Sequence, residues 1–315
     1  MRLAVIGLAS SHVDQIVRLV STGRLGPARI GALWAPVVEP VPADRLTQLR
    51  RAAGLPDHHG PGSSDHHGPH AAGLPDRHKP GSSDHGAPDP LRAALAHGCD
   101  AAIVATRDPR THRALAAPLL AAGLPVFVDK PFVADPADAE ALVAVAERSG
   151  ALLTSSSALR WHPSVQQASH RWARCAVDSA EGITVRVSGP ADPDSPHGGR
   201  IFLGVHAVEA ALAVLAPRAS AETPRVLRVA DHSDRRVAEV AVGPDRAVIE
   251  LGPFDGWRIS GPGVDAALPL DDEYLRPGLL GFVHAVAAGQ DAWPLTGAEL
   301  VDTARVLAEV CGCVR

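Results

Sequence analysis

The sequence LAVIGLASSH, residues 3–12, joins a short apolar run to a polar turn that begins with glycine. The run LAVI predicts a buried β-strand, and Val13–Val20 has the apolar spacing of a helix. A strand, a glycine turn and a helix in this order begin many dinucleotide-binding domains, whose usual fingerprint is G-x-G-x-x-G. Gly7 occupies the first glycine position, whereas Ala9 and His12 replace the second and third. The turn by itself fits either a dinucleotide site or an ordinary strand–turn–helix unit.

Buried strands and helices alternate along the first half of the chain. Apolar runs predict further strands at 28–34, 100–106, 125–128 and 151–154. Two Asp–Pro pairs, at 108–109 and 135–136, predict helix starts, because aspartate caps the first turn and proline suits the first helical position. Gly123 and Gly150 mark the ends of these helices. Strands that alternate with helices predict a parallel, doubly wound α/β sheet of the Rossmann type.

After about residue 155 the pattern changes to short strands in which apolar and polar residues alternate. These predicted strands are 182–189, 225–230, 236–242, 246–252 and 256–261, and closing helices are expected at 277–289 and 297–310. The pattern predicts an open, mostly antiparallel sheet with one face covered. A chain of 315 residues is long enough for two domains. We place a dinucleotide-binding Rossmann domain at 1–131 and an α/β domain for substrate binding and oligomerisation at 132–315.

The composition excludes several classes of function. The net charge is −5 with both signs interspersed, which leaves no basic surface for nucleic acid. No apolar run approaches the roughly 20 residues of a membrane helix, and a folded strand explains the run after Arg2 better than a signal peptide does. Four scattered cysteines do not form a disulfide framework, so we expect free thiols in a reducing compartment. The prediction is a cytoplasmic protein without nucleic-acid or membrane partners.

A near-exact duplication interrupts the first domain. Residues 52–70 (AAGLPDHHGPGSSDHHGPH) and 71–89 (AAGLPDRHKPGSSDHGAPD) match at 14 of 19 positions and hold seven of the 16 histidines. The histidines are typical of a metal-binding tract. The abundance of glycine, proline, serine and aspartate instead indicates a duplicated surface loop that does not fold by itself. We favour the loop at 52–89 and assign no metal ligand.

The sequence VFVDKP, residues 126–131, places a lysine directly after a buried strand. Ligands of doubly wound sheets bind at the carboxyl ends of the strands. Lys130, preceded by Asp129 and followed by Pro131, is therefore a candidate to hydrogen-bond a substrate hydroxyl or a nicotinamide ribose. Partial burial would lower its pKa into a range useful for catalysis. The alternative is a surface lysine paired with Asp129.

Two later segments also carry candidate groups. The sequence GGRIFLGVHAVE, residues 198–209, places His206 after a glycine-rich stretch, where it opens an apolar helix at 207–215. Histidine is the side chain best suited to move a proton near neutral pH, although it can also serve structurally at a helix start. The sequence SSSALRW, residues 155–161, offers hydroxyls and Arg160 to a polar ligand at a strand end. No G-x-S-x-G elbow surrounds these serines, so a serine nucleophile is not expected.

The order of these motifs resembles the glucose–fructose oxidoreductase/inositol dehydrogenase/MocA family. The order is the glycine turn, D-K-P, S-S-S-x-L-R and G-V-H-x-V-E, and the resemblance spans Leu3 to about Val310. Within the family it is closest to a branch with a turn like G-L-D-T-S-H, D-K-P in place of E-K-P, and H-G-V-E after the glycines. The resemblance implies a Rossmann domain followed by an α/β domain with an open sheet. It also implies NAD or NADP bound between them, and a homodimer or homotetramer.

The resemblance assigns roles to individual residues. Lys130 matches the family lysine that contacts the nicotinamide ribose and the reacting hydroxyl, and His206 matches the usual proton acceptor, so both are expected to be catalytic. The expected cofactor-binding residues are Gly7, Leu8, Ala9, Ser10, Ser11, His12, Trp34, Thr106, Arg107, His112, Asp129, Lys130 and Pro131. The expected substrate-binding residues are Arg160, Trp161, His206 and Glu209.

The chain departs from the family pattern in two informative places. The acid expected after the second strand, which would hold the ribose 2′-hydroxyl, is replaced by Trp34 followed by Ala35 and Pro36. The choice between NAD and NADP is therefore open. An aspartate common four residues before the histidine is replaced by Phe202, so the usual Asp–His arrangement is absent.

Three functions remain to be compared. The leading one is an NAD(P)-dependent oxidoreductase that interconverts a secondary alcohol and a ketone on a sugar, cyclitol or similar polar metabolite. In it His206 takes the hydroxyl proton and Lys130 polarises the same oxygen. A second uses tightly held NAD for transient oxidation followed by elimination or hydrolysis, with no net redox change. A third is a binding or regulatory protein that has lost catalysis.

We predict that removing residues 71–89, one copy of the repeat, leaves nicotinamide-cofactor affinity unchanged, because a surface loop contributes nothing to the site. Titration of the deletion variant and the full chain with NADH, followed by nicotinamide fluorescence, measures this. A clear loss of affinity in the deletion variant would instead give the histidine tract a role in function.

Overall fold

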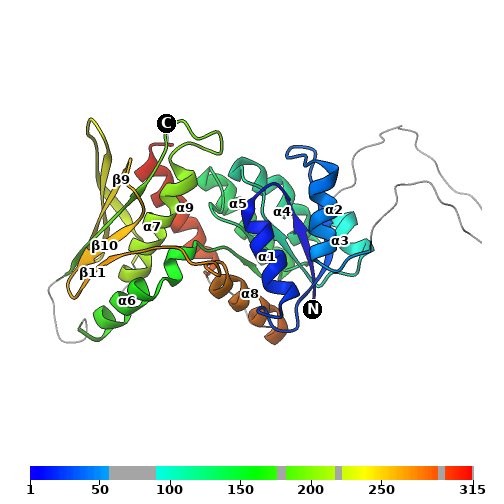
Figure 1. Cartoon of the computed structure of the whole chain (residues 1–315). Helices are drawn as coiled ribbons and strands as arrows, with labels where there is room; N and C mark the ends of the chain where they lie inside the picture. The colour runs from blue at the N-terminus through cyan, green and yellow to red at the C-terminus, as the bar shows by residue number, and fades with distance from the viewer. Residues whose placement is uncertain (57–89, 176–181, 217–221, 290–294, 314–315) are drawn as a thin grey trace, which may run out of the picture.

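Two β-sheets, each covered by helices, make up the chain (Figure 1). The computed structural model describes residues 1–56, 90–175, 182–216, 222–289 and 295–313. Most of the duplicated segment at 52–89 lies outside these residues. Within them, no helix is both long and apolar enough to span a bilayer.

The first sheet is parallel, as the alternation of strands and helices predicts. Its strands are β1 (Arg2–Ile6), β2 (Arg29–Trp34), β3 (Ala101–Val104), β4 (Val126–Val128) and β5 (Leu153–Thr154). They lie in the order β2-β1-β3-β4-β5, and every neighbouring pair is parallel. This confirms the doubly wound α/β sheet. Its last strand lies beyond residue 131, so the sheet continues past that point in the chain.

Helices cover both faces of the first sheet, and two of them come from the far end of the chain. The helices of the N-terminal half are α1 (Ser11–Ser21), α2 (Ala43–Ala52), α3 (Pro90–Ala96), η1 (Pro109–Thr111), α4 (His112–Ala121) and α5 (Pro136–Ser149). Helix α8 (Arg276–Ala288) packs with α1 over one face, through Leu279 and Phe282. Helix α9 (Gly297–Cys311) packs with α4 and α5 over the other, through Leu300 and Ala304. The C-terminal helices therefore tie the two halves together.

The sequence signals for helix ends are confirmed at three places. The Asp135 carboxylate accepts a hydrogen bond from the Ala137 N–H at 2.9 Å and caps α5. The Asp108 carboxylate accepts one from the Arg110 N–H at 3.0 Å and caps η1. Gly150 ends α5 in the left-handed conformation that glycine adopts without strain. Helices α2 and α3 are absent from the sequence-based assignment, although Pro90 opens α3 and Gly54, with positive φ, follows α2.

The second sheet is open and mostly antiparallel, as expected. Its strands are β6 (Thr184–Pro190), β7 (Arg225–Asp231), β8 (Arg236–Val242), β9 (Asp245–Gly252), β10 (Arg258–Gly261) and β11 (Val264–Ala267). Their order is β11-β10-β6-β9-β8-β7, and the central pair β6–β9 is parallel while the others are antiparallel. Two helices precede β6 in the chain, the short η2 (Ala158–Trp161) and α6 (Pro163–Cys175). Helix α7 (Ile201–Leu215) follows β6. Strand β11 has no counterpart among the predicted strands.

Helix α7 begins earlier than the sequence suggests, which corrects the expected position of His206. Gly198 and Gly199 both have positive φ, and the helix starts directly after that turn at Ile201. His206 therefore lies in the second turn of the helix rather than at its start. Nearly every residue of α7 is buried, because the helix packs against β6, β9 and α9 in the core of the second half. Gly204 allows this approach, since a Cβ there would meet Leu251 at 3.0 Å.

We predict that Gly7→Ala destabilises the protein much more than Gly23→Ala does. Both glycines have positive φ, which costs a non-glycine residue about 1–2 kcal/mol. A Cβ at Gly7 would lie 2.5 Å from the Thr106 nitrogen, whereas one at Gly23 has nothing within 4 Å. Gly7→Ala should therefore lose roughly a further 1–3 kcal/mol through overpacking, measured by urea unfolding. Equal losses in the two variants would contradict the close approach of the glycine turn to β3.

Candidate functional site

The carboxyl ends of β1, β3 and β4 bring the predicted cofactor residues to one edge of the parallel sheet. Gly7 follows β1 with φ at 88°, and its N–H donates to the Trp34 carbonyl at the end of β2. Thr106 follows β3, and Asp129 and Lys130 follow β4 directly. Because these strands are neighbours, the residues that follow them meet at the same edge, where ligands of such sheets bind.

The turn after β1 fits an anionic group such as a pyrophosphate. Ser10 caps α1, and its hydroxyl accepts a hydrogen bond from the His12 N–H at 3.2 Å. The N–H groups of Ala9 and Ser11 make no hydrogen bond to any described part of the chain. Free amides at the start of an 11-residue helix bind anions without requiring glycine at every position. Leu8 is buried in the core and anchors the turn.

His12 does not simply replace a glycine, since its side chain forms a buried pair with Asp129. The His12 Nδ1 lies 2.6 Å from an Asp129 carboxylate oxygen, and both residues are less than a tenth exposed. The edge of the His12 ring also contacts the Tyr274 ring. Burial raises the pKa of the Asp129 carboxyl, but the charges of His12 and Lys130 outweigh it and hold the pKa below its usual value. The glycine turn is thereby tied to the end of β4.

Lys130 is a buried lysine, not a surface lysine. It is 5% exposed, and burial lowers the pKa of its ammonium while Asp129 opposes that effect. The Lys130 Nζ lies 4.3 Å from the centroid of the Phe202 ring and 3.5 Å from the Phe202 carbonyl oxygen. An ammonium over an aromatic face is stabilised by the ring quadrupole. Phe202, the residue that replaces the family aspartate, therefore supports the lysine from α7.

His206 is held on the same side of the site as Lys130. It is 3% exposed, and burial followed by the positive charges of Lys130 and His12 lowers its pKa well below the usual value of 6.5. Its Nδ1 lies 2.7 Å from the Ser157 hydroxyl, and its ring meets the edge of Trp257. The two predicted catalytic side chains thus share one electrostatic environment. His206 is neutral near pH 7, which suits it to accept a proton.

Two other expected cofactor residues, His112 and Arg107, form hydrogen bonds at the edge of the sheet. His112 is fully buried, with Nδ1 at 3.0 Å from the Phe132 carbonyl and Nε2 at 2.8 Å from the Thr106 carbonyl. It therefore links the end of β3 to the segment after Lys130. The Arg107 N–H donates to the Glu39 carboxylate at 2.7 Å.

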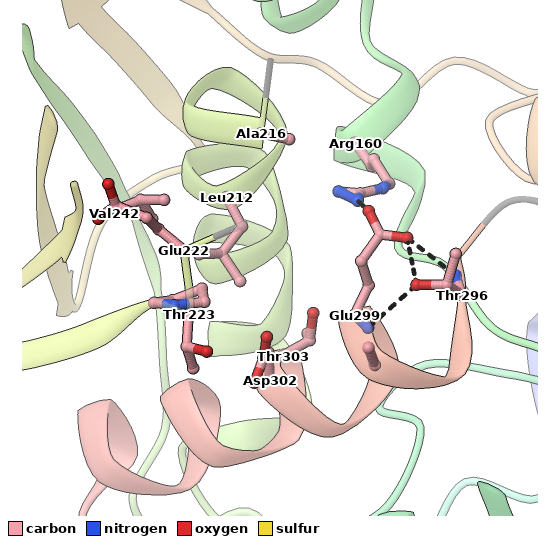
Figure 2. Close-up of a pocket in the computed structure, with 12 residues that line it drawn as sticks. Arg160, Leu212, Ala216, Glu222, Thr223, Val242, Thr296, Glu299, Asp302 and Thr303 are labelled. Carbon is pink, nitrogen blue, oxygen red and sulfur yellow. Dashed lines mark hydrogen bonds and ion pairs between the residues drawn. The ribbon is translucent and has the colours of Figure 1, made fainter. Parts of the chain in front are cut away.

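The expected substrate residues Arg160, Trp161 and Glu209 do not all face Lys130. Arg160 is 8% exposed and lies 3.7 Å from Glu299, and both line one side of a cavity of about 460 Å³ (Figure 2). The lining of that cavity includes neither Lys130 nor His206. Glu209 is buried, and one carboxylate oxygen accepts the Ser157 N–H at 2.9 Å. The Trp161 indole N–H donates to a neighbouring serine hydroxyl at 3.1 Å.

Several residues of the site were not identified from sequence. Ser157 lies within the serine motif but was not singled out, and it contacts His206 directly. Glu39 is the first acid after β2, and its second carboxylate oxygen is buried without a hydrogen-bond partner among the described residues. Tyr274 and Trp257 complete the ring contacts to His12 and His206. No spacing in the sequence points to either aromatic residue.

Part of the chain matches the model of a known protein family. Residues 57–157 match the GFO_IDH_MocA family model, described as an oxidoreductase family with an NAD-binding Rossmann fold. The match covers less than half of the chain. The match includes Asp129 and Lys130, and it confirms the resemblance drawn from the order of the motifs. Residues 57–157 are accordingly similar to the NAD-binding Rossmann domains of oxidoreductases.

Solved structures with the same fold cover almost the whole chain. An oxidoreductase from Agrobacterium radiobacter, in complex with NAD+, L-tartaric acid and magnesium, has a TM-score of 0.70 at 16% identity and covers 100% of this chain and 97% of its own. GenD2 from gentamicin A biosynthesis, in complex with NAD, has a TM-score of 0.71 at 18% identity and covers 99% and 93%. A putative myo-inositol dehydrogenase from Sinorhizobium meliloti 1021 has a TM-score of 0.67 at 15% identity and covers 100% and 98%. No curated protein matches the sequence.

We predict that His12→Ala destabilises the protein by about 3 kcal/mol at pH 7, because it leaves the buried Asp129 carboxylate without its partner. Asp129→Asn should lower the free energy of unfolding less in the His12→Ala variant than in the wild type, since the two side chains act as a pair. Urea unfolding of the single and double variants measures the coupling. Asp14→Asn is the control, because it breaks an exposed pair with Arg45 worth at most about 1 kcal/mol.

The pH dependence of this effect has a definite sign. The pKa of Asp129 is lower in the folded protein, so its stabilisation is present above its unfolded pKa of about 4 and is lost as pH falls through the folded value.

Additive losses in the double variant, or a loss no larger than that of the surface control, would contradict the buried pair.

Proposed function

We propose that this protein is an NAD(P)-dependent oxidoreductase that interconverts a secondary alcohol and a ketone on a sugar, cyclitol or similar polyhydroxylated metabolite. The observation that carries the proposal is the placement of a buried, neutral His206 beside a buried Lys130 at the carboxyl edge of a Rossmann sheet. Such a histidine can accept a proton from a substrate hydroxyl while the lysine donates a hydrogen bond to the same oxygen.

His206 acts as the base in the oxidative direction. Its neutral ring accepts the hydroxyl proton as the carbonyl forms, and returns that proton in the reductive direction. The Lys130 ammonium donates a hydrogen bond to the same oxygen and stabilises the negative charge that develops on it. The nicotinamide cofactor supplies the hydride acceptor or donor when bound. The burial of both side chains excludes water from the reacting oxygen.

The chain's own residues also suggest how the cofactor is held. The N–H groups of Ala9 and Ser11 would bind the pyrophosphate, and Lys130 would contact the nicotinamide ribose. Glu39 brings a carboxylate to the same edge of the sheet through the Arg107 N–H. A carboxylate accepts a ribose 2′-hydroxyl but repels a 2′-phosphate. We therefore propose NAD as the preferred cofactor, with Glu39 in the role usually filled by an acid at the end of β2.

Further observations support a proposed substrate class, assembly and location for the protein. Structures with the same fold include a putative myo-inositol dehydrogenase and a UDP-N-acetylglucosamine 3-dehydrogenase, which favours a polyhydroxylated substrate. Leu227 and Val229 on β7 are 47% and 38% exposed, which favours the second sheet as a contact in a homodimer or homotetramer. Three cysteines are free thiols, which suits the cytoplasm.

We predict that Lys130→Ala and His206→Ala each lower kcat at least about 100-fold while the fold survives, because each removes a group that acts on the reacting oxygen. The assay screens cyclitols, sugars and sugar acids for NAD+ reduction at 340 nm. His170→Ala, at an exposed histidine on α6, is the control and should retain full activity.

Two outcomes would overturn the proposal. Near-normal rates in either variant would remove that residue from the mechanism. Nucleotide that co-purifies with the protein, together with substrate turnover but no net change at 340 nm, would instead favour transient oxidation followed by elimination or hydrolysis.

We also predict that kcat/KM for alcohol oxidation does not fall as the pH is lowered from 8 to 6.5, with its acid limb below 6.5. The base must be neutral, and burial and nearby positive charges keep the pKa of His206 well below 6.5, so the active form persists over this range. The measurement is a pH–rate profile in buffers of constant ionic strength. An acid limb at or above 6.5 would contradict the buried, neutral histidine.

A further inference from the structure

We propose that Ser157 is a positioning residue that fixes the ring orientation and the tautomer of His206, and that Glu209 holds Ser157 in place for this purpose. The proposal deepens the assignment of His206 as the proton acceptor and rests on it.

The contact between the two side chains is direct and shielded from solvent. The Ser157 hydroxyl lies 2.7 Å from the His206 Nδ1, and Ser157 is completely buried. The Trp257 ring, at 4.9 Å between centroids, limits rotation of the imidazole from another side. With Nδ1 occupied by the serine, Nε2 is the nitrogen left to exchange a proton with substrate. The hydrogen bond therefore decides which nitrogen does the chemistry.

Ser157 is itself held by two contacts besides the one to His206. Its backbone N–H donates to the Glu209 carboxylate at 2.9 Å, and its hydroxyl accepts the Leu159 N–H at 3.3 Å. Glu209 lies three residues after His206 on α7, so both side chains project from one face of the helix. Helix α7 thereby holds the serine through its backbone and its hydroxyl at once. Removal of the hydroxyl would free the imidazole without disturbing the Glu209 contact.

The proposed role of His206 requires one tautomer. A base that accepts at Nε2 must carry its proton on Nδ1, and that N–H then donates to the Ser157 oxygen. The oxygen accepts this bond and the one from Leu159 with its two lone pairs.

The arrangement also explains how the site works without an acid four residues before the histidine. That position is Phe202, which supports Lys130 instead. A carboxylate on Nδ1 would favour the imidazolium, whereas a neutral hydroxyl orients the ring without adding negative charge. His12, Asp129 and Lys130 are the charged groups that act on His206, and their net effect with burial keeps it neutral. Ser157 thus supplies orientation without stabilising the protonated form.

The test combines a tautomer measurement with kinetics. Nitrogen-15 NMR of histidine-labelled protein at pH 7 reads which nitrogen of His206 carries the proton, and His206→Gln assigns the signal. We expect the Nδ1–H form in the wild type and in Ser157→Thr, and a shift toward Nε2–H in Ser157→Ala. Ser157→Ala should also lower kcat about 10- to 100-fold with KM within about two-fold, because binding is kept while alignment is lost. Ser157→Thr keeps the hydroxyl and should recover most of the rate.

Ser169→Ala is the control, since it removes a buried serine hydroxyl from α6 and should change neither readout. An Nε2–H signal in the wild type, or an unchanged tautomer and kcat in Ser157→Ala, would overturn the proposal. The Nδ1–H tautomer in a protein that oxidises no alcohol with either nicotinamide cofactor would support the role of Ser157 and count against the proposed reaction.

Discussion

The burial of Asp129 and Lys130 at the end of β4 is the constraint on which the rest of the site depends. Two adjacent charges at 5% exposure are costly unless each has a partner, because burial removes the hydration of both. His12 supplies the partner of the carboxylate, and the Phe202 ring supports the ammonium. These two side chains come from α1, which packs on the first sheet, and from α7, which packs on the second. Both halves of the molecule therefore contact this buried pair at one edge of the first sheet.

In the proposed reaction, the same burial divides the chemistry between Lys130 and His206. Asp129 opposes the lowering of the Lys130 pKa by burial, whereas His206 has no carboxylate on its ring and its pKa lies well below 6.5. A charged donor and a neutral acceptor beside each other are what reversible alcohol oxidation requires. The C-terminal helices α8 and α9 stabilise this geometry, because they pack on opposite faces of the N-terminal sheet.

Local signals in the sequence predicted the fold well. Strands β1 to β5, the Asp108 and Asp135 caps and the open second sheet all follow from short-range patterns, and short-range patterns are what sequence reading captures. The start of α7 was missed because two glycines resemble a loop, while the residues after them form a core helix packed on β6 and β9. Strand β11 was missed because its four residues lie at the edge of the sheet and alternate weakly.

The site was predicted less completely, because its decisive contacts join residues far apart in sequence. His12 and Asp129 are separated by 117 positions, and Ser157 and His206 by 49. No periodicity connects such pairs, so His12 was assigned to the cofactor and Ser157 was not singled out. Arg160 was expected at the substrate, yet its partner Glu299 lies on α9 and faces a different cavity. Motif order located the edge of the sheet, and only the packing defines which side chains meet there.

The most direct test of this account is a titration of the purified protein with NADH and with NADPH, followed by nicotinamide fluorescence. The account predicts saturable binding of NADH, at least about ten-fold tighter than NADPH, because Glu39 repels a 2′-phosphate. A folded sample that binds neither nucleotide would contradict the assignment of the β1 turn and Lys130 to a nicotinamide cofactor.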